Sequence, residues 1–131
     1  MNFKNILTIE PQNSEHLQSI YSKSDYKRYN VNHFYFKEYI KSPNGLFQAL
    51  CTTIEKLKPV VILIHYGGEF KKHKDIFIPI LKQIRVKFDQ EIRVGIQRRL
   101  ALQEIDDEIL QVVDNDDDTI SIEKLIFKRN R

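Results

Sequence analysis

His65 is the side chain in this sequence that most plainly invites a chemical interpretation, because it ends the apolar run of the segment KPVVILIHYGGEF, residues 58–70. An imidazole can accept a proton or a phosphoryl group near neutral pH. A phosphohistidine would need an exposed ring and groups that hold the anion, whereas a histidine at a strand end can simply hydrogen-bond to a neighbouring loop. We favour this second, structural interpretation of His65 and keep the first as its alternative.

The other histidines and the single cysteine do not form a recognisable reactive site. His16, His33 and His73 show no metal-ligand spacing with His65 or Cys51, so we predict no metal site. Cys51 lies beside the apolar stripe of a predicted helix, which favours a core position, and one cysteine cannot form an internal disulfide. Since no nucleophile–base pair and no phosphate-binding glycine motif occurs, we predict a protein that is not an enzyme and uses no cofactor.

Five basic side chains follow two of the predicted strands, in the loops GGEFKKHKD and QRRLALQ: Lys71, Lys72, Lys74, Arg98 and Arg99. If these loops share one edge of a sheet, they surround His65 with positive charge and attract a phosphate, a carboxylate or an acidic protein surface. Long lysines in a loop are also commonly just solvated. The basic residues are not interleaved with exposed aromatics and no helix carries a basic stripe, which argues against nucleic acid as the partner of this domain.

Strand-like and helix-like segments alternate along the chain, and they must position these groups. The alternation predicts parallel strands joined by crossover helices that cover both faces of one sheet. We expect five strands, four helices and the beginning of a fifth helix. The predicted strands are 6–9, 31–39, 60–66, 91–97 and 118–122, and the predicted helices are 13–28, 42–58, 75–88, 102–113 and from 123 onward.

Length and composition are those of one soluble domain. The chain has 131 residues, of which 41% are hydrophobic and 30% charged, and a formal net charge of +3. No apolar run reaches the roughly 18 residues of a membrane span, and the first residues lack the pattern of a signal peptide. Together with the single cysteine, these features predict a cytoplasmic protein without membrane contact.

Three sequence segments, in this order and spacing, resemble the receiver domain of two-component response regulators. KNILTIEPQ (4–12) is similar to the opening strand with its acidic pair, IEKLKPVVILIHYGG (54–68) to the passage into the phosphorylated aspartate, and DNDDDTISIEKL (114–125) to the passage into the fifth strand. The resemblance implies a flavodoxin-like (CheY-like) three-layer α/β sandwich, with a parallel five-stranded sheet of order 2-1-3-4-5. Its functional crevice would lie at the carboxyl ends of the strands.

The receiver's chemical groups are missing at the matching positions. The acidic pair that should hold a divalent cation falls on Glu10 and Pro11, and the phosphoacceptor falls on His65. The switch hydroxyl falls on Gln97, and the lysine that neutralises the product falls on Ile122, with no proline after it. The resemblance therefore implies a degenerate receiver, a pseudo-receiver without Mg²⁺-dependent aspartyl phosphorylation.

These observations predict a non-catalytic pseudo-receiver, spanning residues 1–131, that acts as a phosphorylation-independent protein–protein interaction or dimerisation module. We expect it in bacterial signal transduction or transcriptional regulation, as the N-terminal part of a longer regulator. The partner would contact the face of the fourth helix and fifth strand, where acidic residues from 104–118 and basic residues from 124–131 could pair across a two-fold axis. The alternative is a sensor of a small anionic ligand, bound near His65 by Lys71, Lys72, Arg98 and Arg99.

Overall fold

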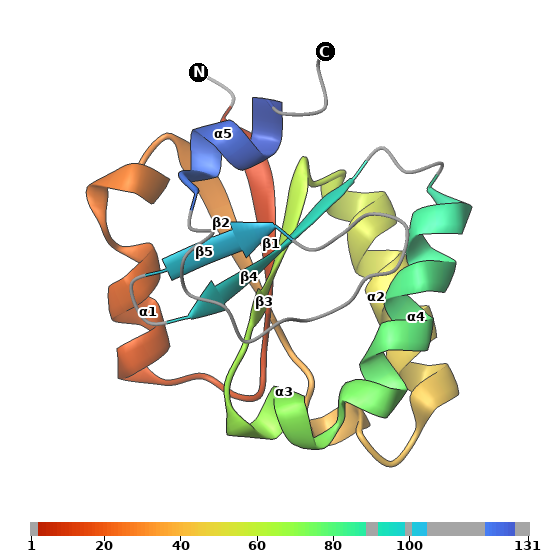
Figure 1. Ribbon diagram of the computed structural model, residues 1–131. Coiled ribbons are helices and arrows are strands. Elements are labelled where there is room, and N and C mark those ends of the chain that lie inside the picture. Colours follow the sequence, from red (N-terminus) through yellow and green to blue (C-terminus); the bar gives the residue numbers. More distant parts are fainter. Residues whose placement is uncertain (1–2, 89–91, 99–100, 105–119, 128–131) are drawn as a thin grey trace.

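The computed structural model (Figure 1) describes residues 3–88, 92–98, 101–104 and 120–127, and these form an α/β fold around one five-stranded sheet. The strands are β1 (Lys4–Glu10), β2 (Tyr29–Tyr35), β3 (Val61–His65), β4 (Arg93–Arg98) and β5 (Ala101–Glu104). The helices are α1 (Glu15–Tyr21), α2 (Pro43–Leu57), α3 (Gly68–Lys72), α4 (Lys74–Lys87) and α5 (Ile122–Phe127), with short 3-10 turns η1 (Ser24–Tyr26) and η2 (Lys37–Tyr39).

The sheet has the predicted strand order, β2-β1-β3-β4-β5, but it is not parallel throughout. The pairs β1–β2, β1–β3 and β3–β4 are parallel, whereas β4 and β5 are antiparallel. Arg98 ends β4 and pairs with Ala101, the first residue of β5. A link this short can only form a hairpin, because a parallel connection needs a crossover of roughly a dozen residues. The prediction of a fully parallel sheet is therefore wrong at β5.

Two predicted segments near the C-terminus are wrong in the residues that the structure describes. Residues 102–104 belong to β5 and not to a fourth helix, and the remainder of that predicted helix lies outside the described residues. Ile122, predicted to end the fifth strand, is instead the first residue of α5. The Ser121 hydroxyl accepts a hydrogen bond from the Lys124 backbone N–H (3.1 Å), and this contact caps the start of α5.

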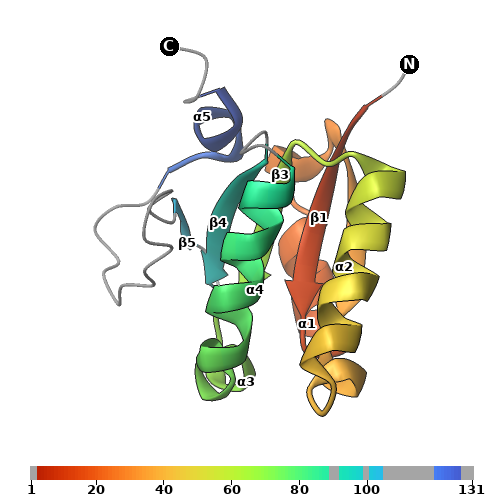
Figure 2. The same cartoon turned by 90° about the vertical axis from the view of Figure 1, so that its right-hand side faces the viewer.

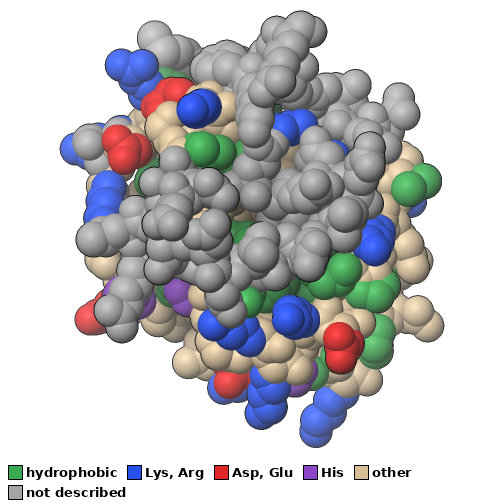
Figure 3. All heavy atoms as spheres, in the orientation of Figure 1, with side chains coloured by type: hydrophobic (Ala, Val, Ile, Leu, Met, Phe, Trp, Pro, Cys, Tyr) green, Lys and Arg blue, Asp and Glu red, His purple; other side chains and the backbone are tan. Residues whose placement is uncertain are grey.

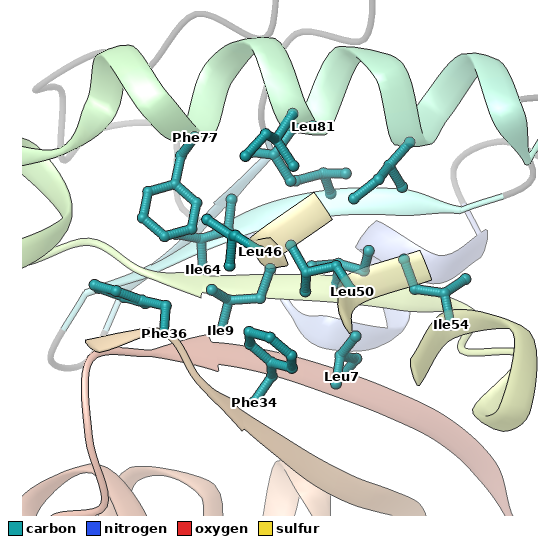
Figure 4. Close-up of a cluster of buried hydrophobic side chains, with 14 of the residues drawn as sticks. Leu7, Ile9, Phe34, Phe36, Leu46, Leu50, Ile54, Ile64, Phe77 and Leu81 are labelled. Carbon is teal, nitrogen blue, oxygen red and sulfur yellow. The ribbon is translucent and has the colours of Figure 1, made fainter. Parts of the chain in front are cut away.

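Helices cover both faces of the sheet, as the alternation predicts. In Figure 1, α1 and α5 lie on one side and α2 and α4 on the other, while Figure 2 shows α2 and α4 side by side. Side chains alternate along β1, so Leu7 and Ile9 pack towards α2 and α4 (Figure 4), and Ile6 packs with the α1 and α5 side chains. Cys51 is buried in the first of these cores, as predicted.

The face towards α1 and α5 changes character along the strands. It is apolar where α5 covers it: Ile122, Leu125 and Ile126 pack with Ile6 and Leu63. Towards the carboxyl ends of the strands, the next side chains on the same face, which recur every second residue, are polar. They are Thr8 and Glu10 on β1, His33 and Tyr35 on β2, His65 on β3 and Gln97 on β4. Among the described residues, no helix is long and apolar enough to cross a membrane.

Candidate functional site

The polar residues at the carboxyl ends of the strands form one cluster, here called the carboxyl-edge cluster. The sheet register aligns Glu10 with Tyr35 and His65 with Gln97, so each strand from β2 to β4 contributes at the same level. On one side the cluster is bordered by α1 and η1, which contribute Tyr21 and Tyr26. The members are Thr8, Glu10, His33, Tyr35, His65, Gln97, Tyr21 and Tyr26.

Glu10 is fully engaged inside the protein. Only 1% of its surface is exposed, and its Oε1 accepts a hydrogen bond of 2.5 Å from the Thr8 hydroxyl. The Nδ1 atom of His33 lies 2.5 Å from the same oxygen. A buried carboxylate with these partners is stabilised where it is, because buried polar groups need hydrogen bonds and buried charges need a partner. A metal bound through this oxygen would compete with both contacts.

The contacts of His33 do not form a catalytic triad. The Thr8 hydroxyl oxygen lies 2.9 Å from His33 Nδ1, the same nitrogen that Glu10 contacts. In a serine-protease type of triad the imidazole uses one nitrogen for the nucleophile and the other for the carboxylate, so that it can accept the proton of the hydroxyl. The threonine, histidine and glutamate instead close a compact triangle, which favours a structural role.

His65 lies next to this triangle with its ring half-buried. Its Nδ1 is buried and has no hydrogen-bond partner among the described residues, so the expected hydrogen bond to a neighbouring loop is not made through this atom. A Cβ atom at Gly67 would lie 3.1 Å from His65 Nε2, which shows that the glycine leaves room for the ring. Burial lowers the pKa of His65 below its ordinary value, and this effect outweighs the opposing influence of Glu10.

Gln97, which the resemblance aligns with the receiver's switch hydroxyl, is also held in place. It is 3% exposed, and the Tyr26 hydroxyl donates a hydrogen bond of 2.5 Å to its Oε1. Tyr26 packs edge-on against Tyr21, whose ring also contacts that of His33. The Tyr21 hydroxyl is buried without a hydrogen-bond partner among the described residues, and burial raises its pKa well above the usual range. Tyr21 of α1 and Tyr26 of η1 therefore pack against His33 and Gln97 from this side of the sheet.

The remaining predicted site residues do not join the cluster in the described part of the chain. Pro11 follows the end of β1, and its carbonyl oxygen accepts a hydrogen bond from the Lys37 N–H (3.0 Å). Ile122 is 2% exposed in the apolar core beneath α5 and not at a strand end, so its predicted placement at the functional edge is wrong. The apolar surroundings favour isoleucine there, whereas a lysine would have to leave its charge unsolvated.

The predicted anion-binding residues are described only in part. Lys71 and Lys72 lie on α3, and Lys71 Nζ is 4.8 Å from the centroid of the Tyr66 ring. Figure 3 shows Lys and Arg side chains at the end of the molecule where α3 lies. Arg98 ends β4, but the structure does not describe its side chain, and Arg99 lies outside the described residues. Convergence of the four cations around His65 therefore stays a prediction.

Sequence reasoning identified Glu10, His65 and Gln97 but missed their partners. Thr8 could have been found, because it lies two residues before Glu10 in the same strand and so shares its face. His33 required the register between β1 and β2, which pairs it with Thr8. In the described part of the chain, no group of three or more histidine, cysteine or acidic side chains is arranged to hold a metal ion.

Comparison with known proteins adds no assignment to this geometry. No family model matches the sequence, and neither the curated proteins nor the solved structures give a significant match. A function for the chain must therefore be inferred from the arrangement of its own residues.

Proposed function

We propose that this chain is a receiver-like module without phosphotransfer chemistry, which acts through protein–protein contacts in bacterial signal transduction or transcriptional regulation. The observation that carries the proposal is the state of Glu10. The carboxylate at the carboxyl end of β1 is 1% exposed and is held by Thr8 and His33. It is thus a structural group at the position where a receiver has an exposed metal ligand.

The surrounding positions support the same conclusion. Mg²⁺ requires near-octahedral coordination by oxygen and usually keeps several waters, so its protein ligands must be accessible carboxylates. His65 supplies a half-buried imidazole with a lowered pKa where the receiver has its phosphoacceptor. Gln97 has a buried side-chain oxygen bonded to Tyr26 where the receiver has its hydroxyl. None of these three residues can perform the receiver's step, in which a carboxylate attacks a metal-bound phosphoryl group.

An interaction role does not depend on the face of the fourth helix and fifth strand that the resemblance suggested. Since β5 is a four-residue hairpin strand, that face differs here from the arrangement we expected. The strand order 2-1-3-4-5 and the helices on both faces still favour a receiver-like scaffold. The alternative, an anion sensor, would use Lys71 and Lys72 at the same end of the molecule.

Thermal unfolding with Mg²⁺ and beryllofluoride, which mimics an acyl phosphate, tests this proposal. We expect no change in Tm, because Glu10, the carboxylate at the carboxyl end of β1, is buried and already held by Thr8 and His33. A ligand present at 100 times its Kd would add about 2.7 kcal/mol, or on the order of 10 °C for a domain of this size. Stabilisation by Mg²⁺ and beryllofluoride would refute the proposal. Stabilisation by inorganic phosphate alone would favour the anion sensor.

A further inference from the structure

The two edges of the sheet are protected to different degrees. β5 forms one edge; it is only four residues long, and its Leu102 carbonyl already accepts a hydrogen bond from the Ile120 N–H (2.8 Å). β2 forms the other edge, and all seven of its residues pair with β1. In the part of the chain that the structure describes, no strand pairs with the opposite side of β2.

β2 also lacks the features that normally protect an edge strand. Natural sheets guard such edges with lysine, proline, inward charges or bulges. The sequence YNVNHFY (29–35) contains no proline, no lysine and no acidic residue. The register with β1 advances one residue for one, so the strand has no bulge. Only Phe34 is buried, and the other six side chains are partly or fully exposed. The edge is thus long, regular and accessible.

The direction in which the backbone N–H and C=O groups of β2 point determines which residues could pair with a further strand. The Phe36 N–H, just after the strand, donates to the Glu10 carbonyl of the β1 segment (2.9 Å). In a parallel ladder, alternate residues bond to the same neighbour, so the even-numbered residues of β2 face β1. The backbone groups of Tyr29, Val31, His33 and Tyr35 therefore point away from the sheet. These four residues are arranged symmetrically about Asn32.

We propose that β2 pairs antiparallel with β2 of a second copy of this chain, across a two-fold axis at Asn32, and so joins the two sheets into one. This inference rests on the proposed interaction function and names the surface and the partner. An isologous strand pair requires outward-facing residues to meet outward-facing residues, and the axis at Asn32 satisfies this condition. Tyr29 lies opposite Tyr35 of the second copy, and Val31 lies opposite His33.

The side chains of this pairing are compatible with one another. Four outward-facing residues from each strand would make about eight backbone hydrogen bonds across the axis. Tyr29 would meet an aromatic ring and Val31 an imidazole, which are favourable cross-strand neighbours. The strand has no lysine, arginine or acidic residue, so no formal like charges face each other at its centre. A second copy thus matches both the polarity and the hydrogen-bonding pattern of the edge.

Charged substitutions on the axis test the pairing directly. Asn32→Lys places two ammonium groups opposite each other, and Asn32→Asp places two carboxylates there. By sedimentation equilibrium of the full chain, we expect a wild-type dimer and a Kd raised about tenfold or more at low salt by either variant alone. An equimolar mixture of the two variants should recover the dimer. Gln48→Lys and Gln48→Asp, at an exposed position on α2, are the matched controls and should leave the Kd unchanged.

A second variant covers the case in which Asn32 substitutions impair folding, because the Asn32 amide contacts Asn5 and the Ile6 carbonyl. Val31→Pro removes an outward-facing N–H without breaking the β1 ladder, so the fold should survive and the dimer should weaken at least tenfold. A wild-type chain that stays monomeric at several hundred micromolar would overturn the pairing, and so would a folded Val31→Pro dimer of unchanged Kd.

The outcomes separate this inference from the proposed function. A monomeric chain that does not respond to Mg²⁺ and beryllofluoride would refute the β2 pairing but leave an interaction with a different protein intact. A chain stabilised by beryllofluoride would refute the proposed function, whatever its oligomeric state.

Discussion

Glu10→Gln distinguishes a structural carboxylate from a metal ligand, because the two roles predict opposite effects on stability. In a pocket built to hold a cation, the acidic groups repel one another, so neutralising one leaves stability unchanged or raises it. In this protein the carboxylate is 1% exposed and Oε1 accepts from Thr8 and contacts His33 Nδ1. Neutralising it should therefore weaken two charge-assisted hydrogen bonds.

The size of the effect follows from these two contacts. A hydrogen bond to a charged group contributes about 1.5–3 kcal/mol, against about 0.5–1.5 kcal/mol for a neutral one. The glutamine amide keeps the shape of the side chain and one acceptor oxygen, so each contact loses about 1 kcal/mol. We expect Glu10→Gln to lower the free energy of unfolding by about 2 kcal/mol. In urea this corresponds to a midpoint lower by about 1 M, since m is about 1–3 kcal/mol/M for small proteins.

Urea unfolding at pH 7, followed by circular dichroism, is the assay, and Glu55→Gln is the matched control. Glu55 is 59% exposed and its Oε1 lies 3.8 Å from Lys87 Nζ, so losing this surface pair should cost at most a few tenths of a kcal/mol. If Glu10→Gln proves as stable as Glu55→Gln, or more stable than the wild type, Glu10 is not a structural group and the reasoning about the closed cluster fails.

Three further predictions concern the packing and the electrostatics of the same face. Tyr26→Phe removes the hydroxyl that donates to the buried Oε1 of Gln97, so it should lower the free energy of unfolding by about 1–2 kcal/mol. The control Tyr21→Phe removes a hydroxyl without a described partner and should be neutral or stabilising, and equal losses of the two variants in urea unfolding would contradict this. Gly95→Ala should lower the free energy of unfolding by about 1–3 kcal/mol, because its Cβ would lie 2.7 Å from a side-chain atom of α5 and 3.2 Å from a backbone oxygen of β5. In the control Gly68→Ala the Cβ meets nothing within 4 Å, so that variant should be neutral or slightly stabilising; a harmless Gly95→Ala would show that α5 packs elsewhere. Because burial holds the pKa of His65 below its ordinary 6.5, the unfolded chain binds this proton at a higher pH than the folded chain, and stability should fall as the pH drops below 6.5 towards the folded pKa. His65→Gln should flatten this part of the plot of stability against pH, and an unchanged slope would contradict the assignment.

The strand order could be predicted because the central strands carry strong local signals. Val61–Ile64 of β3 is a continuous apolar run, as expected for a strand covered on both faces, and α2 begins with the Ser42–Pro43 start signal that the sequence displays. β5 could not be predicted in the same way. The hairpin between Arg98 and Ala101 contains no glycine, asparagine or proline, so the sequence lacks the usual turn residues.

The site was predicted only where single positions could be aligned with the receiver pattern. Glu10 and His65 were found as misfits in that pattern, but their roles depend on neighbours that are distant in sequence. His33 meets Glu10 only because β2 pairs with β1 in one particular register. Tyr26 reaches Gln97 because the segment after α1 turns into η1, where we expected one continuous helix. Local periodicity does not contain either piece of information.

The most direct test of the central claim is a two-dimensional ¹H–¹⁵N NMR titration of the chain with Mg²⁺ and then with beryllofluoride. Backbone amides of Gly67, Gly68 and Gln97 report on the carboxyl edge, where a receiver binds both species. If the carboxyl-edge cluster is closed, these resonances stay unchanged up to millimolar concentrations. Saturable shifts confined to these amides would contradict the account, because they would require an accessible cation and phosphoryl site beside Glu10.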